Sequence, residues 1–211
     1  MSITKYVFRH YDQITSEYTR YKSWEYCYSY FRKRNIDKDT AALHLAFYLA
    51  SWGMYRGSGF LLQNDYKIHE PAVDLLLKKN NSSLWISDNE NSFTEKYVDS
   101  LCGLKKEIQN AYGNNNCSDT LITKILLGTL GTTPAYDRYF RSGAKLVIGK
   151  AHSFNKKSYS SIISFCNSNI DEIRRVQKRI KSKQGIKYPI MKIVDMYFWQ
   201  LGYEMEQKAG K

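Results

Sequence analysis

A chain of 211 residues, 43% hydrophobic and 25% charged, has the composition of an ordinary globular protein and is long enough to bury a core without disulfides or metal ions. Its net charge is +12, yet no uncharged apolar stretch reaches the ~18 residues that span a bilayer, so we expect a cytoplasmic protein with no membrane partner. The scattered cysteines and histidines and the lack of glycine-rich nucleotide motifs predict no disulfide framework, no metal and no cofactor, and nothing indicates the oligomeric state.

The N-terminal part predicts two helical regions. Residues 3–33 are expected to form one or two helices. They carry an aromatic stripe at helical spacing, which is more typical of a core face than of a base-stacking surface. Residues 40–55, capped by Asp39, carry no charge from Ala41 onward, so we expect this helix to be central and buried. Arg56 follows at once in a glycine-rich bend. It either satisfies the last helix carbonyls or binds an anion at the floor of a cleft.

The middle of the chain predicts short helices separated by polar breaks. Helices are expected over 60–63, 71–79, 95–112, 118–127 and 134–140, with a polar loop over 80–91. Ser92 and Glu95 have the spacing of a capping box, and Ser118 is a typical N-cap. Pro134 suits the first turn of the last helix of this group.

The C-terminal part predicts the longest helix. Residues 142–152 are expected to form a short strand through 146–148, or else a loop, and residues 158–182 one long amphipathic helix. Pro189 precedes a final helix. We therefore expect one all-α domain over 1–211, an orthogonal bundle of about eight helices with a basic part over 145–211.

Positive charge is concentrated in this C-terminal part. Residues 145–192 hold twelve Lys and Arg but only two acids. The asymmetry favours a polyanionic partner, namely nucleic acid, DNA or RNA; the alternative is a solvated basic face that only keeps the protein in solution. The phosphate-contacting candidates are Arg174, Arg175, Lys178, Arg179 and Lys181.

The segment 123–140 contains the main candidate site. It predicts a helix, a turn containing Gly128 and Gly131, and a second helix, an arrangement whose free backbone N–H groups can hold a phosphate without reading sequence. Lys124 and Asp137 flank the turn and are expected to face a common cleft. A simpler role for Lys124 is that of a surface lysine. Simpler roles for Asp137 are an ion pair with Arg138 or Arg141, or a hydrogen bond within its own helix.

The same segment resembles a helix-hairpin-helix element. Leu130, Gly131 and Ala135 fit that pattern, whereas Thr129 stands where a glycine is expected. The order of lysine, proline and aspartate is similar to the helix-hairpin-helix DNA glycosylase superfamily, although Asp137 follows the hairpin sooner than in that superfamily. The resemblance implies a lysine that attacks the sugar and an aspartate that stabilises the positive charge developing on it. Separately, residues 43–63 resemble an uncharacterised bacterial all-helical family, which implies no activity.

These patterns lead to one functional hypothesis and two alternatives. We expect a nucleic-acid-binding protein, with DNA glycosylase-like base or sugar chemistry as its enzymatic extension, in which Lys124 and Asp137 are catalytic. The expected substrate-binding residues are Trp52, Tyr55, Arg56, Gly128, Gly131 and Tyr136. The first alternative is a non-catalytic helical module whose basic face meets an acidic protein. The second is an enzyme acting on a small anionic substrate in a pocket lined by the aromatic residues and Arg56.

Overall fold

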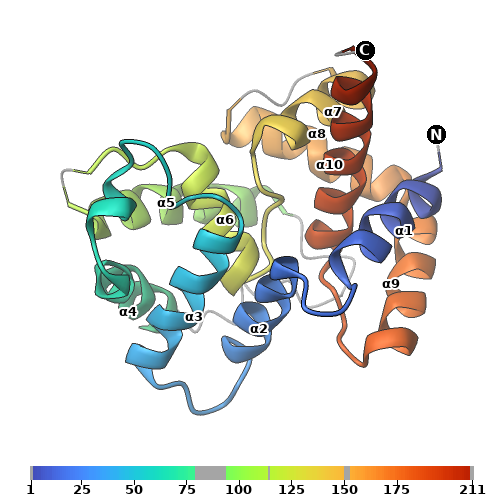
Figure 1. Cartoon of the computed structure of the whole chain (residues 1–211). Helices are drawn as coiled ribbons and strands as arrows, with labels where there is room; N and C mark the ends of the chain where they lie inside the picture. The colour runs from blue at the N-terminus through green and yellow to red at the C-terminus, as the bar shows by residue number, and fades with distance from the viewer. Residues whose placement is uncertain (1, 79–93, 114, 150–152, 210–211) are drawn as a thin grey trace.

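The computed structural model describes residues 2–78, 94–113, 115–149 and 153–209, and this part of the chain is all-helical (Figure 1). The α-helices are α1 (Ile3–Ile14), α2 (Ser23–Tyr30), α3 (Lys38–Ser51), α4 (Glu70–Lys78), α5 (Glu95–Ala111), α6 (Asp119–Thr129), α7 (Arg138–Ile148), α8 (Lys156–Ser168), α9 (Ile170–Gln184) and α10 (Ile190–Ala209), with short 3-10 helices η1 (Arg20–Lys22), η2 (Phe60–Gln63) and η3 (Tyr66–His69). None of these helices is long and apolar enough to cross a membrane.

The helices pack around two neighbouring centres. In Figure 1, α10 lies against α7, with α1 and α9 beside it, so that the first and last helices of the chain are in contact. The other centre is α3, which packs against α2, α4 and α6. Leu45 and Leu49 are fully buried on the inner face of α3, which confirms the expected central position of this helix, whereas Leu43 and Phe47 are 52% and 53% exposed, so the expectation that the whole helix is buried is wrong.

Helices α7 and α10 cross with their backbones in close contact. A Cβ on Gly143 would lie 1.9 Å from the Phe198 carbonyl oxygen, and one on Gly202 would lie 2.0 Å from the Tyr139 carbonyl oxygen. Only glycine leaves room for the two backbones at these points. The crossing therefore fixes α7, whose first residues border the cleft described below, against the C-terminal helix.

Helix ends differ from the sequence expectation where tertiary contacts compete with local signals. The cap of α3 is Asp37, whose carboxylate accepts from the Thr40 N–H at 2.8 Å, rather than Asp39, which accepts from the Tyr66 hydroxyl. The Ser118 cap of α6 is confirmed by the 3.2 Å bond from the Leu121 N–H. At α5 the cap is Thr94; the expected capping residue Ser92, like the loop over 80–91, lies outside the described residues.

Three expectations for the second half of the chain are wrong. Residues 146–148 continue helix α7, whose other face packs on α10, and form neither a strand nor a loop. The helix expected over 134–140 begins only at Arg138, because the backbone N–H groups of Ala135 and Tyr136 donate to side chains of α10 and α6. The long helix over 158–182 breaks at Asn169, whose side-chain amide donates to the Phe165 carbonyl at 2.8 Å and whose backbone leaves the helical region. This break and the separation of α1 from α2 explain why the described residues form ten α-helices, not about eight.

Candidate functional site

A cleft of about 670 Å³ opens where η1, the end of α3, α6, the start of α7 and α10 meet. Its charged lining residues are Arg20, Arg56, Lys124, Arg138, Arg141 and Asp137. Its aromatic lining residues are Tyr21, Trp52, Tyr139 and Trp199. Of the described residues that line it, five therefore carry positive charge and one carries negative charge, so the cleft is an electropositive, partly aromatic concavity.

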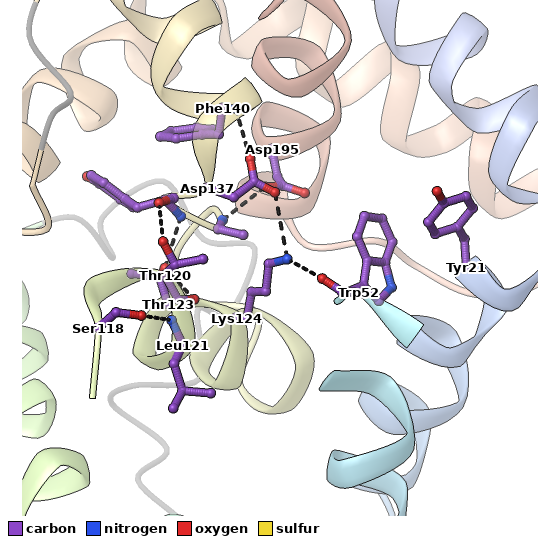
Figure 2. A network of polar contacts seen from close by, with 12 residues as sticks. Tyr21, Trp52, Ser118, Thr120, Leu121, Thr123, Lys124, Asp137, Phe140 and Asp195 are labelled. Atoms are coloured by element: carbon purple, nitrogen blue, oxygen red, sulfur yellow. Dashed lines mark hydrogen bonds and ion pairs between the residues drawn. The ribbon is translucent and has the colours of Figure 1, made fainter. Parts of the chain in front are cut away.

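Lys124 lies at the floor of this cleft and is only 5% exposed (Figure 2). Its ammonium group donates to the Trp52 carbonyl oxygen at 2.8 Å and lies 3.7 Å from the nearer Asp137 carboxylate oxygen. Burial lowers the pKa of Lys124, and the carboxylates of Asp137 and Asp195 offset part of that effect. The amine is therefore easier to deprotonate than a surface lysine, and it also ties α6 to the residue that ends α3.

Asp137 is the N-cap of α7 rather than a residue of its first turn. One carboxylate oxygen accepts from the Phe140 N–H at 3.0 Å, and the other faces Lys124 (Figure 2). The sequence offered Arg138 or Arg141 as its partner, but the ion pair that Asp137 forms is with Lys124. A carboxylate at this position is stabilised by the helix dipole as well as by the lysine.

The connection from α6 to α7 is held by hydrogen bonds to both neighbouring helices. The Thr120 hydroxyl donates to the Tyr136 carbonyl at 2.8 Å, and the Tyr136 N–H donates to the Thr123 hydroxyl at 2.9 Å. The Ala135 N–H donates to a carboxylate oxygen of Asp195 at 2.9 Å (Figure 2). The backbone that carries Asp137 is thus fixed relative to Lys124, which is what a preorganised site requires.

A second, fully buried ion pair lies beneath the cleft, and we did not expect it from the sequence. The Lys192 ammonium lies 3.3 Å from Asp195, and each is at most 2% exposed. The same ammonium lies 4.9 Å from the ring centroids of both Trp24 and Trp52. Burial raises the pKa of Asp195, and Lys192 opposes that rise. Two charges three residues apart on an apolar helix were the only signal for this pair in the sequence.

The four arginines of the cleft differ in their surroundings. Arg20 and Arg138 each lie over the ring of the tyrosine that follows them, and Arg138 also pairs with Glu206 at 3.1 Å. Arg56 and Arg141 form no ion pair with any carboxylate of the described residues, and the Nε of Arg141 is buried without a hydrogen-bond partner there. An anion in the cleft would supply the acceptors that these two side chains lack.

Several residues expected at the site lie elsewhere. Tyr136 is fully buried and its hydroxyl bonds to Ser158, Tyr55 bonds to His69, and neither lines the cleft. Gly128 lies inside α6, where a Cβ would meet the Tyr48 ring at 2.4 Å, so glycine here serves packing. Gly131, with φ +68°, ends α6 instead of offering its backbone to the cleft.

The basic helix does not border the cleft either. The α9 helix packs against α1, α8 and α10, and the Arg179 guanidinium covers the Phe8 ring at 4.1 Å. None of its five candidate phosphate-contacting residues lines the cleft. The cleft and the exposed cations of α9 are therefore two separate electropositive surfaces.

The described residues contain no group of three or more His, Cys, Asp or Glu side chains that could hold a metal ion. Comparisons with models of known families, with curated proteins and with solved structures each find no match for this chain. A functional proposal for this chain therefore rests on the geometry of the cleft.

Proposed function

We propose that this chain is a nucleic-acid-binding protein and that the cleft is its principal contact surface. The observation that carries the proposal is the excess of cations over carboxylates around a cleft that also presents four aromatic rings. Arginines contact phosphate oxygens and aromatic rings stack on bases, so the lining matches both parts of a nucleotide unit. The exposed cations of α9 add phosphate contacts outside the cleft. We also infer that the chain is one orthogonal helical domain and that it acts in the cytoplasm.

Glycosylase-like base or sugar chemistry is the enzymatic extension of this proposal. Lys124 would supply an amine whose lowered pKa favours the nucleophilic, unprotonated form, and Asp137 a carboxylate that stabilises positive charge developing on the sugar. Both groups line the cleft and lie 3.7 Å apart. Lys124 and Asp137 also have structural roles through their hydrogen bonds to the backbone, so the chemistry needs a separate test.

An enzyme for a small anionic substrate is the second candidate. The volume of the cleft, about 670 Å³, falls in the ~300–1,000 Å³ typical of small-molecule sites. A nucleoside monophosphate carries the same phosphate and base groups that the cleft would contact in a nucleic acid. Millimolar nucleoside monophosphate that displaces an oligonucleotide poorly would favour the strand over the free nucleotide.

The proposal is tested by removing charge from the cleft and, in a matched control, from elsewhere. Fluorescence anisotropy with a labelled oligonucleotide would compare R56A/R141A with K96A/K106A, which removes the same charge from the exposed side of α5. The cleft variant is expected to weaken binding and to reduce the log–log salt slope by about 1.4, at ~0.7 per lost single-strand contact. Equal effects of the two variants would show that net charge alone, and not the cleft, attracts nucleic acid.

A further inference from the structure

Two arginine–tyrosine pairs of the same construction border the cleft. The Arg20 guanidinium lies 4.9 Å from the Tyr21 ring centroid and donates to the Tyr21 hydroxyl at 3.1 Å. The Arg138 guanidinium lies 4.6 Å from the Tyr139 ring centroid and donates to the Tyr139 hydroxyl at 2.8 Å. In each pair the guanidinium therefore lies against the tyrosine ring and is also held by a hydrogen bond to its hydroxyl, and we call such a pair an arginine–tyrosine layer.

Each tyrosine is in turn supported by a tryptophan of the cleft. The ring centroids of Tyr21 and Trp52 are 4.8 Å apart, and those of Tyr139 and Trp199 are 4.9 Å apart. Figure 2 shows Trp52 between Lys124 and Tyr21, with Asp137 on the other side of Lys124. These ring contacts restrict the orientation of Tyr21 and Tyr139, the rings on which Arg20 and Arg138 lie.

Two nitrogens of the Arg138 guanidinium already have partners in the protein. Its Nε pairs with Glu206 at 3.1 Å, and one terminal nitrogen donates to Tyr139. The side chain is nevertheless 71% exposed, so its outer face is accessible. A guanidinium with occupied edges and an open face is suited to stacking on a base more than to gripping a phosphate.

Arg56 and Arg141 have the complementary property. Neither forms an ion pair with a carboxylate of the described residues, and both line the same cleft. Their charge and hydrogen-bond donors are available to a phosphate, where an arginine can bind two oxygens at once. The cleft thus separates into stacking surfaces and phosphate-binding side chains.

We propose that the cleft selects single-stranded nucleic acid, with bases stacked on the Arg20–Tyr21 and Arg138–Tyr139 layers and phosphate held by Arg56 and Arg141. This inference rests on the proposed function and specifies its substrate class. Only unpaired bases expose the faces that such layers need, because the bases of a duplex already stack on one another. A cleft of about 670 Å³ also has the size of a small-molecule site and is too small to enclose a duplex.

The test uses the full chain and three fluorescein-labelled probes of ten nucleotides. They are a mixed-sequence single strand of DNA, the same sequence as a duplex, and an abasic strand that keeps every phosphodiester but has no bases. We expect the single strand to bind about tenfold more tightly than the abasic strand, in line with the contribution of one stacked base, and more tightly than the duplex.

Charge-conserving variants then separate stacking from charge. R138K keeps the positive charge but removes the plane, so it is expected to reduce the preference for the base-bearing strand over the abasic strand by several-fold. R141K keeps a cation that can still contact phosphate, so it should leave that preference unchanged. Arg138 is exposed, so its replacement leaves the core intact, and circular dichroism of both variants would verify folding.

The outcomes distinguish this inference from the proposed function. Equal affinity for the single strand, the duplex and the abasic strand would overturn the single-strand inference while nucleic-acid binding stands. An R138K preference equal to that of the unmodified protein would overturn the stacking role of Arg138. Binding to none of the three probes at low salt would overturn both proposals together.

Discussion

Each charged side chain at the floor of the cleft has a structural and a chemical role. Lys124 satisfies the carbonyl at the end of α3, and Asp137 satisfies an N–H at the start of α7. Their ion pair connects these two helix ends across the cleft. Substitutions that change one property of a residue and keep the others are therefore needed to tell the roles apart.

Two substitutions of Asp137 separate its capping role from its charge. D137N keeps an oxygen that accepts from the Phe140 N–H, and asparagine is a good N-cap, whereas D137A removes the acceptor. We expect D137A to lower the free energy of unfolding by about 1 kcal/mol more than D137N does. Urea unfolding of both variants measures the difference, and equal losses would show that capping contributes nothing here.

The same D137N variant tests the glycosylase-like extension. Removing the negative charge while keeping the shape should abolish release of a base from damaged DNA and leave oligonucleotide binding at least as strong. The affinity should not fall, because the variant removes the carboxylate that repels phosphate in the cleft. Base release is measured by strand cleavage after alkali. Unimpaired release would exclude Asp137 from the chemistry, and no release by the unmodified protein on any damaged substrate would end the glycosylase extension.

His69 makes the stability of the fold depend on pH. It is buried between the Tyr55 and Tyr112 hydroxyls, at 2.7 and 2.6 Å, and burial lowers its pKa to about 4. Its pKa in the unfolded chain is ~6.5, so the unfolded state binds more protons between these values, and stability falls as pH falls through that window. We expect His69 to account for a loss of about 2 kcal/mol between pH 7 and pH 4.5.

Urea unfolding at the two pH values, for the unmodified protein and for H69Q, isolates this contribution. The glutamine variant cannot take up the proton, so its stability should fall less over the same interval. The buried His10, whose pKa burial lowers to about 3, contributes in the same direction in both proteins and cancels in the comparison. Parallel losses in the two proteins would show that His69 does not control the acid response.

At the scale of helices, the arrangement depends on a few backbone contacts and not on the helices' own propensities. Local signals identified α3, α5, α6 and α10 because their caps or apolar patterns are consistent with their surroundings. The start of α7 and the break between α8 and α9 differ from what the local sequence predicted. There, side-chain hydrogen bonds to distant or neighbouring backbone groups override the local pattern.

The glycine crossing of α7 and α10 predicts a large effect from a single methyl group. G143A would place a Cβ 1.9 Å from a carbonyl oxygen, so the helices must separate, and we expect a loss of at least about 3 kcal/mol in the free energy of unfolding. Chemical or thermal unfolding measures it. The matched control is G103A in the exposed part of α5, where no atom lies within 4 Å of the new Cβ. Because alanine favours helix, G103A should gain up to about 1 kcal/mol. Similar changes in the two variants would contradict this view of the crossing.

At the scale of the whole molecule, the cleft and the exposed face of α9 each contribute an excess of positive charge to the net charge of +12. The two surfaces do not share residues, and α1 packs against α9 on one side of the bundle. A nucleic acid longer than the cleft would therefore gain affinity from α9 without altering what the cleft recognises.

This division predicts that the α9 cations change the salt dependence of binding but not its preference for bases. R175A/K178A/K181A removes three exposed charges and should reduce the log–log salt slope on a 30-nucleotide single strand by about 2. The ratio of affinities for base-bearing and abasic strands should stay the same. Anisotropy titrations at several salt concentrations measure both quantities, and an unchanged slope would exclude α9 from the contact surface.

The sequence by itself determined the all-α class, the central position of α3, the cap of α6 and the uneven charge. Each of these depends on composition or on neighbours within one or two turns of a helix, which periodicity and capping residues report directly. The proximity of Lys124 and Asp137 was expected from the sequence because only a short connection separates their helices.

Only the tertiary structure decided what surrounds that pair. Trp52, Trp199 and Arg20 come to the cleft from helices distant in the chain, and the buried Lys192–Asp195 pair holds the connection between α6 and α7 from below. Tyr136, Tyr55 and both hairpin glycines do not line the cleft, and α9 lies apart from it. Such placements follow from how helices cross and which backbone groups they satisfy, and these are long-range contacts that no local pattern of residues specifies.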